Sequence, residues 1–284
     1  MKLVVFGKTG QLARALARRA PEAVFLDRAA ADLEDPEACA AALTQAAAAG
    51  AQAAINAAAY MAVDRAEEEE PLATRINGAA PAAMARAAAA AGIPFVQVSS
   101  DYVFDGSGAA PWTPEAPVAP LSAYGRSKAA GEAGVRAAGG AHAILRTSWV
   151  FSADGGNFVK TMLRLGRARD EVRVVDDQVG GPTEAGDIAG ALLVMVRALH
   201  DDPGRSGTYH FAGTPDVSWA DFAEAVMTGA GLDCTVTRIP SSDYPMAAER
   251  PLNSRLDCSR TEQVFGIARP DWRAGLTRVL EALT

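Results

Sequence analysis

The sequence contains few of the residues that build disulfide frameworks and metal centres. Its 284 residues include only three cysteines and three histidines. The cysteines, Cys39, Cys234 and Cys258, are far apart along the chain, and the histidines are equally scattered. A small, odd number of distant cysteines indicates reduced thiols, as in a cytoplasmic protein. We therefore expect neither a disulfide framework nor a metal site.

Long hydrophobic runs and clusters of basic residues are also missing. Hydrophobic residues make up 49% of the chain, but alanine tracts interrupted by charges supply much of this, so no membrane span is expected. The formal net charge is −7, and no basic patch is present to neutralise the phosphates of a nucleic acid. The length is sufficient for one large domain and one smaller domain. These properties are typical of an α/β enzyme that acts on small molecules.

The chain opens with the pattern of a dinucleotide-binding unit. Residues 2–6 are an apolar, β-branched run, which we interpret as a buried strand. The turn Gly7-Lys-Thr-Gly10-Gln-Leu-Ala13 follows, and then a helical pattern that stops near Pro21. Gly7 permits a tight turn, Gly10 a close approach of phosphate, and Ala13 close packing of helix on strand. The backbone N–H groups and the helix dipole of such a unit are suited to a pyrophosphate.

Two adjacent residues bear on the choice of cofactor. A second apolar strand over residues 24–26 ends in Asp27, twenty residues past Gly7, where an acid can hold a ribose diol. Arg28 follows, and a guanidinium can pair with a 2′-phosphate. The two side chains favour different cofactors, so we expect NADPH or NADH. Arg28 is equally compatible with a solvated surface arginine.

Apolar runs alternate with helical patterns along the chain. This alternation predicts an α/β fold with a Rossmann-like, doubly wound parallel sheet. We expect a dinucleotide-binding domain and a smaller, discontinuous, C-terminal substrate-binding lobe. The first spans residues 1–150 plus about 173–212, and the second spans about 151–172 and 213–284. Ligands are expected in the cleft between them, beyond the carboxyl ends of the strands.

The pentapeptide Tyr124-Gly-Arg-Ser-Lys128 follows a proline-rich loop. Ser122 is suited to cap a helix that runs toward Gly139, and positions i and i+4 share a helix face. A phenol has an ordinary pKa of about 10, and a cation nearby lowers it, so the pair suits proton exchange near neutrality. The spacing alone is common and is also typical of an amphipathic surface pair.

A second polar group is predicted at the end of another strand. Residues 95–98 form an apolar run that ends in Ser99-Ser100-Asp101. The hydroxyl of Ser100 is placed to hydrogen-bond a substrate oxygen, and Asp101 lies beside it. A turn that caps the next segment would use the same residue types. We favour the functional interpretation because Tyr124 and Lys128 follow downstream.

Together these motifs resemble the extended short-chain dehydrogenase/reductases. The shared features are Gly7-x-x-Gly10-x-x-Ala13, Asn56-Ala-Ala, Ser99-Ser100 and Tyr124-x-x-x-Lys128. Longer blocks, which span nearly the whole chain, are similar to one family among them, the dTDP-4-dehydrorhamnose reductases. These blocks include Phe6-Gly-Lys-Thr-Gly-Gln-Leu12, Ser100-Asp-Tyr-Val-Phe-Asp-Gly106, Arg146-Thr-Ser-Trp-Val150, Asp177-Gln-Val-Gly-Gly-Pro-Thr183 and Arg250-Pro-Leu-Asn-Ser-Arg-Leu256. The resemblance implies reduction of the C4 ketone of dTDP-4-dehydro-β-L-rhamnose to dTDP-L-rhamnose by NADPH or NADH.

The resemblance also implies a role for individual residues. Tyr124 is the general acid that protonates the C4 oxygen, and Lys128 holds the nicotinamide ribose and lowers the pKa of Tyr124. Ser100 stands where the family usually has threonine and keeps its hydroxyl. The implied cofactor pocket comprises Gly7, Gly10, Gln11, Leu12, Asp27, Arg28, Asp32, Leu33, Ala58, Ala59, Tyr60, Val98, Tyr124 and Lys128. The implied substrate contacts are Ser100, Asp101, Trp149, Asn253 and Arg255.

The resemblance bears on assembly as well. Some members of the family pair through a magnesium ion held by glutamates at three positions. The matching residues here are Ala15, Gly186 and Ala282, none of which can bind a hard cation. We therefore expect no metal and either a monomer or a homodimer without a metal bridge.

Two other functions remain open at the level of sequence. One is another sugar-nucleotide epimerase, reductase or dehydratase of the same superfamily. Dehydratases resemble one another in a hydroxyl-Asp-Glu trio, whereas Tyr102 follows Asp101 here. The other is a non-catalytic regulatory subunit that binds the same ligands, against which the presence of Tyr124 and Lys128 argues.

Overall fold

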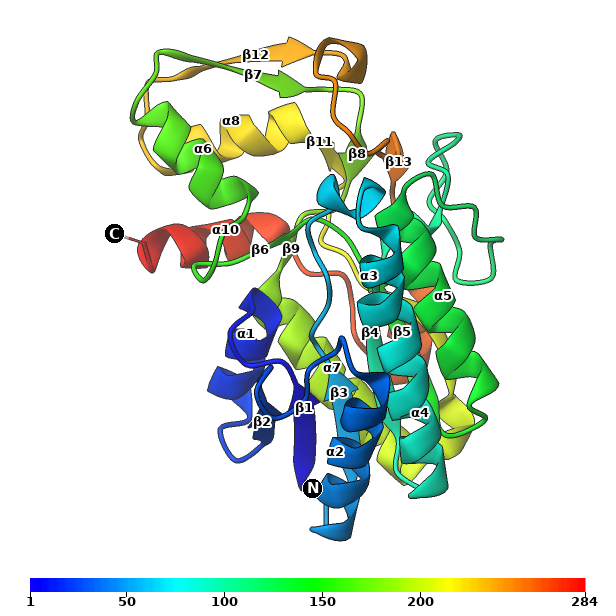
Figure 1. The fold of residues 1–284 in the computed structure, drawn as a ribbon. Coiled ribbons are helices and arrows are strands. Elements are labelled where there is room, and N and C mark those ends of the chain that lie inside the picture. Colours follow the sequence, from blue (N-terminus) through cyan, green and yellow to red (C-terminus); the bar gives the residue numbers. More distant parts are fainter. Residues whose placement is uncertain (284) are drawn as a thin grey trace.

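A six-stranded parallel sheet forms the centre of the larger lobe, and a smaller lobe lies at one end of it (Figure 1). This computed structural model describes residues 1–283. The strand order is β10-β5-β4-β3-β1-β2, and every neighbouring pair is parallel. The strands are β1 (Leu3–Phe6), β2 (Val24–Leu26), β3 (Ala53–Asn56), β4 (Phe95–Ser100), β5 (His142–Thr147) and β10 (Gly207–His210).

The winding of the sheet changes direction between β1 and β3. From β1 the chain first moves outward to β2, then returns past β1 to β3, β4 and β5. Open parallel sheets bind ligands at such a switch point, beyond the carboxyl ends of the strands. The predicted Rossmann-like class is therefore confirmed, and its binding edge is fixed by the strand order.

Helices cover both faces of this sheet (Figure 1). One face carries α1 (Gln11–Arg19) and α7 (Ala185–Asp201), whose buried leucines and alanines pack on β1, β3 and β5. The other face carries α2 (Pro36–Ala48), α4 (Ala80–Ala90) and α5 (Ala123–Ala137). Short helical segments precede α4 or join other elements: η1 (Arg65–Glu67), α3 (Glu70–Thr74), η2 (Arg75–Ala79), η3 (Asp101–Val103), η4 (Pro203–Arg205) and η5 (Ser241–Asp243).

The helix that carries the Tyr-x-x-x-Lys pattern is α5, and local chemistry sets both its start and its position. Its first turn is capped by Ser122, whose hydroxyl accepts a hydrogen bond from the N–H of Gly125 at 3.2 Å. A Cβ atom at Gly131 would lie only 2.2 Å from the carbonyl oxygen of Asn77. Glycine therefore lets α5 approach η2 closely, and Tyr124 and Lys128 keep a defined position beside β4.

The smaller lobe has its own core, in which Phe151, Phe222 and Trp272 are buried. Its sheets are small: β7 pairs with β12, β8 lies between β11 and β13, and β6 pairs with β9. The strands are β6 (Val150–Phe151), β7 (Glu171–Val175), β8 (Val179–Gly180), β9 (Thr183–Glu184), β11 (Val217–Ser218), β12 (Thr235–Ile239) and β13 (Asn253–Ser254). The helices are α6 (Phe158–Gly166), α8 (Trp219–Gly229) and α10 (Trp272–Glu281).

Two segments near the expected boundary between the lobes bear on where that boundary is placed. Strand β7 begins near the expected return at residue 173, yet it pairs with β12 rather than with the main sheet. The helix α9 (Ser259–Phe265) was expected in the smaller lobe, yet it lies against α7 and β10 of the larger lobe. Its Phe265 ring contacts that of Tyr209, with ring centroids 4.7 Å apart. We propose that residues 173–184 belong with the smaller lobe and α9 with the larger one. Among residues 1–283, no helix is both long enough and apolar enough to span a membrane.

Candidate active site

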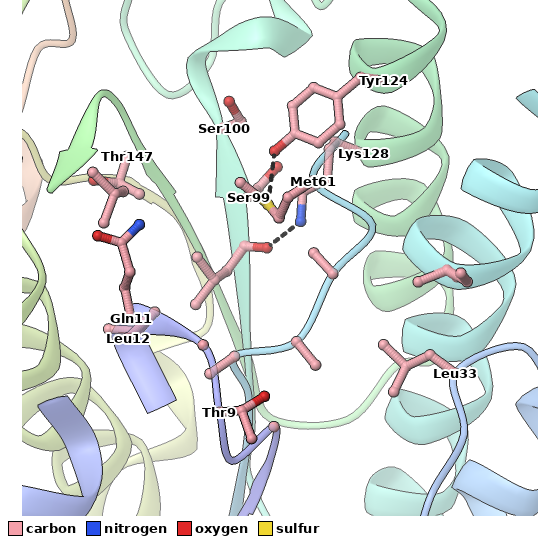
Figure 2. Close-up of a pocket in the computed structure, with 18 of the residues that line it drawn as sticks. Thr9, Gln11, Leu12, Leu33, Met61, Ser99, Ser100, Tyr124, Lys128 and Thr147 are labelled. Atoms are coloured by element: carbon pink, nitrogen blue, oxygen red, sulfur yellow. Dashed lines mark hydrogen bonds between the residues drawn. The ribbon is translucent and has the colours of Figure 1, made fainter. Parts of the chain in front are cut away.

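A cavity of about 710 Å³ lies at the switch point, between the two lobes (Figure 2). Its walls come from the turn after β1, the segment after β3, the ends of β4 and β5, and the first turns of α5. Most of the residues predicted from the sequence line it: Gly7, Gly10, Gln11, Leu12, Asp27, Arg28, Asp32, Leu33, Ala58, Ala59, Val98, Ser100, Asp101, Tyr124, Lys128 and Trp149.

The glycine turn forms one end of the cavity. Gly7 has a φ of +108°, and a Cβ atom there would lie 3.3 Å from the Cβ of Ala58, so a side chain would be strained and crowded. Gly10 is the N-cap of α1 and has open space where a Cβ would stand. No side chain caps α1, so its first N–H groups are available to an anion in the cavity.

The two residues expected at the cofactor ribose are both in ion pairs. Lys8 Nζ donates to Asp27 Oδ2 at 3.3 Å, and this hydrogen bond lowers the pKa of Asp27. Arg28 Nε donates to Asp32 Oδ2 at 3.0 Å, and the same guanidinium pairs with Glu34. Arg28 lines the cavity and is also an exposed, paired side chain, so the two sequence interpretations of this residue are compatible.

The three polar groups expected at the reacting carbonyl come together on β4 and α5. Tyr124 and Lys128 are each only 4% exposed and share one face of the helix. Tyr124 Oη donates to Met61 Sδ at 3.6 Å, and Lys128 Nζ donates to the carbonyl oxygen of Val98 at 2.7 Å (Figure 2). Ser100 Oγ donates to Asp101 Oδ1 at 2.9 Å. The end of β4 and the start of α5 thus place two hydroxyl groups and an ammonium on one cavity wall.

Burial sets the protonation of this group. It raises the pKa of Tyr124 above its ordinary value, and the nearby Asp101 carboxyl adds to the rise. This direction is opposite to the lowering expected from the Tyr-Lys spacing, because burial disfavours the charged phenolate and is the largest influence on this pKa. Burial also lowers the pKa of Lys128, to about 8. At neutral pH Tyr124 is therefore a protonated phenol, which is the form that can donate a proton.

Two residues that line the cavity each carry a buried oxygen atom with no hydrogen-bond partner among residues 1–283. These atoms are Oδ2 of Asp101 and Oγ1 of Thr147. Ser100 is paired with Thr147 in the β4–β5 register, so the two atoms belong to neighbouring strand ends. Burial raises the pKa of Asp101 to about 6. Because buried polar groups are almost always hydrogen-bonded, these two atoms are suited to a polar ligand.

Tryptophan side chains from both lobes meet at the cavity. Trp149 has a φ of +49°, a left-handed conformation that is uncommon for a bulky residue. Its indole stacks on that of Trp219, with ring centroids 3.7 Å apart and planes 10° apart. The stack places an apolar surface between β5 and α8. A strained backbone held by a ring stack at a cavity is typical of a ligand-binding position.

Three of the predicted residues do not line the cavity. The hydroxyl of Tyr60 donates to Glu69 Oε2 at 2.7 Å. Asn253 is buried, and its Nδ2 donates to the carbonyl oxygen of Ala110 at 2.9 Å. Arg255 Nη1 donates to Asn253 Oδ1 at 3.0 Å. Asn253 and Arg255 hold the 107–112 loop against β13, so their contacts are structural here.

The residues of the cavity wall that the sequence interpretation did not assign to the site include Met61, Thr147 and Trp219. Thr147 is the last residue of β5 and lies inside a block that the family resemblance had already marked, and Met61 lies in the segment after β3. The position of Thr147 at a strand end was the available signal. Trp219 lies in the smaller lobe, and only the long-range stack with Trp149 brings it to the site.

The three positions at which the resemblance implied that some members have glutamates also come together. Ala15, Gly186 and Ala282 line a second cavity of about 440 Å³ between α1, α7 and α10. The nearest carboxylates on its wall are paired with arginines: Asp154 with Arg18 at 2.7 Å and Glu184 with Arg278 at 3.3 Å.

Proteins of known family are similar to this chain along its whole length. The family model described as the RmlD substrate binding domain matches residues 1–284. The dTDP-4-dehydrorhamnose reductase of Sinorhizobium fredii is 41% identical, over 100% of this chain and 98% of its own. The enzyme of the same name from Escherichia coli K12 is 37% identical, with the same coverage.

Two solved structures share the whole fold. A dTDP-4-dehydrorhamnose reductase from Clostridium acetobutylicum gives a TM-score of 0.91 at 35% identity, over 100% of this chain and 99% of that one. The enzyme of that name from Bacillus anthracis, in complex with NADP, gives a TM-score of 0.90 at 32% identity, over 99% and 100%. The chain therefore belongs to the dTDP-4-dehydrorhamnose reductase family of NAD(P)-dependent oxidoreductases.

Proposed function

We propose that the protein reduces the C4 ketone of dTDP-4-dehydro-β-L-rhamnose with NADPH or NADH, giving dTDP-L-rhamnose. The observation that carries the proposal is the buried, protonated Tyr124 beside Ser100 and Lys128, in the same cavity as the glycine turn. The family membership supports the substrate class, and the NADP in the Bacillus anthracis structure supports the cofactor.

The cavity fits a nicotinamide dinucleotide. The open space at Gly10 and the uncapped N-terminus of α1 suit a pyrophosphate. Asp27 and Arg28 would hold the adenosine ribose with or without its phosphate, and Lys128 would hold the nicotinamide ribose. When bound, the reduced cofactor supplies a hydride to the ketone carbon. The protein's own task is to orient the ketone and to supply a proton.

Tyr124 supplies that proton in the proposed reaction. As negative charge develops on the C4 oxygen, the O–H bond of Tyr124 breaks and a new O–H bond forms on the sugar. Ser100, also on the wall, orients the ketone oxygen by a hydrogen bond. The phenolate left behind is stabilised by the Lys128 ammonium, one helical turn away on the same face.

The remaining cavity wall supports a sugar nucleotide as the second ligand. Oδ2 of Asp101 and Oγ1 of Thr147 lack protein partners, and sugar hydroxyl groups would satisfy both atoms. The stacked pair of Trp149 and Trp219 offers an apolar face beside them. The proposal includes a monomer or a homodimer without a metal bridge, since Ala15, Gly186 and Ala282 supply no carboxylate.

The direct test follows NADPH absorbance while the keto-sugar nucleotide is generated in the same solution. We expect absorbance to fall only when the ketone is present, and mass spectrometry to show a product that has gained two hydrogens. dTDP-glucose, which has no ketone, is the matched control. NADPH binding without oxidation of NADPH or NADH would instead indicate a regulatory subunit, and a product of unchanged mass would indicate an epimerase.

The pH dependence of the proposed reaction should follow the loss of a proton from the Lys128 ammonium. Burial lowers the pKa of Lys128 to about 8, whereas the pKa of Tyr124 is raised above its ordinary value. As pH rises through about 8, the ammonium loses its charge while Tyr124 stays protonated. We therefore expect kcat/KM, which reports groups of the free enzyme, to fall through this range.

The variant Lys128→Arg tests whether Lys128, rather than Tyr124 or another group, causes the fall in kcat/KM near pH 8. The guanidinium keeps its charge, so the fall near pH 8 should vanish, although the rate should be lower because arginine and lysine differ in shape. A fall that persists unchanged in Lys128→Arg would assign it to another group.

A further inference from the structure

A methionine sulfur covers the proposed acid. Met61 lies in the segment after β3 and lines the cavity, where its Sδ accepts the hydrogen bond of Tyr124 Oη at 3.6 Å (Figure 2). Met61 is 63% exposed, whereas Tyr124 is 4% exposed. The Met61 residue is thus open to solvent, and its sulfur contacts the buried hydroxyl.

No other sulfur of residues 1–283 combines these two properties. The three cysteines are free but buried, and the methionines at 84, 162, 195 and 227 are buried as well. Met1 and Met246 are exposed, at 41% and 44%, but neither lines this cavity. A small oxidant in solution therefore meets Met61, Met1 and Met246 first, and only the first of them contacts the site.

We propose that Met61 is an oxidation site through which a peroxide switches the enzyme off, by converting the thioether that contacts Tyr124 into a sulfoxide. The inference rests on the proposed role of Tyr124 as the acid. In the reaction a sulfur lone pair attacks one peroxide oxygen, the O–O bond breaks and an S–O bond forms. The sulfur loses two electrons, and the other oxygen leaves as water after taking up the proton that the sulfur-bound oxygen releases.

The change in hydrogen bonding explains the loss of activity. A thioether is a weak acceptor, so a ketone oxygen readily takes its place at the Tyr124 hydroxyl. A sulfoxide oxygen is a strong, polar acceptor attached to the same flexible side chain. It would hold the hydroxyl and compete with the substrate. One hydrogen bond of ordinary strength corresponds to about a tenfold change in an equilibrium constant, so we expect kcat/KM to fall about tenfold.

The experiment compares hydrogen peroxide-treated and untreated protein. Peptide mass spectrometry follows the sulfoxide at Met61, Met1 and Met246, and kcat/KM and NADPH binding are measured on the same samples. The inference predicts that kcat/KM falls in step with the Met61 sulfoxide, that NADPH still binds, and that methionine sulfoxide reductases restore the rate. Oxidised Met61 with an unchanged kcat/KM would overturn it.

Two variants assign the effect to one sulfur. The rate of the Met61→Leu variant should be the same before and after peroxide treatment, even if it differs from the rate of the parent protein. Met246→Leu, which removes an exposed methionine outside the cavity, should lose activity as the parent protein does. Loss of activity in treated Met61→Leu would place the damage elsewhere and contradict the inference.

A spectroscopic readout separates this inference from the proposed function. If untreated protein shows no turnover, the proposed function fails, and the contact is tested by NMR of ¹³C-methyl-labelled methionine. The methyl resonance of Met61 sulfoxide should then differ between the parent protein and Tyr124→Phe, because only the former has the hydroxyl. Identical resonances would overturn the inference independently of activity.

Discussion

Tyr124→Phe is expected to lower kcat by a factor of about 10² to 10⁴, the range that general acid catalysis contributes in enzymes. The ring remains, so its edge-to-face contact with Tyr102, at a centroid distance of 5.5 Å, is kept. Only the hydroxyl that faces Met61 and the cavity is lost. Cofactor binding should change little, because the glycine turn and Lys128 are untouched.

The measurement is single-turnover NADPH oxidation together with a separate titration of NADPH binding. Tyr209→Phe is the matched control, since Tyr209 is also buried but donates its hydroxyl to the carbonyl oxygen of Arg205 at 2.6 Å, away from the cavity. Its turnover should equal that of the parent protein. Full activity in Tyr124→Phe would remove this residue as the acid and favour a water or Asp101 in that role.

The fold could be predicted because its signals are local. Strand, glycine turn and helix follow one another within residues 2–19, and the buried runs of β3, β4 and β5 recur between helices. The positions of Tyr124 and Lys128 on one helix face followed from their spacing, and the cap at Ser122 from its residue type. In each case neighbouring residues determine the outcome.

The features that sequence reasoning missed depend on distant contacts. The pairing of β7 with β12 joins segments about sixty residues apart, and nothing within Glu171–Val175 distinguishes it from a strand of the main sheet. The pKa of Tyr124 depends on the burial of the whole α5–β4 interface, which the Tyr-Lys spacing does not contain. Asn253 and Arg255 stand at positions of a family motif, yet the Asn253 side chain donates hydrogen bonds into the 107–112 loop and the Arg255 side chain donates to Asn253.

The same helix that carries the proposed acid is held by a buried ion pair. Glu132, two turns after Tyr124 on α5, is fully buried and receives Arg146 Nε at 2.8 Å and Nη2 at 2.7 Å. Ser99 Oγ, on β4, donates to the same carboxylate at 2.7 Å. Although burial opposes ionisation, the hydrogen bonds from Arg146 hold the pKa of Glu132 below its usual value.

Glu132→Gln is therefore expected to lower the free energy of unfolding by about 3–5 kcal/mol, the cost of leaving one charge of a buried pair unmatched. Arg146 is 2% exposed and cannot turn to solvent, and His210 beside it is neutral because burial and Arg146 lower its pKa to about 3. Urea unfolding followed by circular dichroism gives the measurement.

The matched control is Glu70→Gln, because Glu70 forms a comparable two-point pair with Arg126, at 2.7 and 2.8 Å, on the protein surface. Surface pairs contribute about 1 kcal/mol or less, so this variant should lose little stability. Replacing both Glu132 and Arg146 with methionine should recover much of the loss, since no buried charge is then left unpaired. Equal losses in Glu132→Gln and Glu70→Gln would show that the buried pair does not anchor α5 to the sheet. In that case the position of Tyr124 and Lys128 would depend on the close packing of α5 at Gly131 instead.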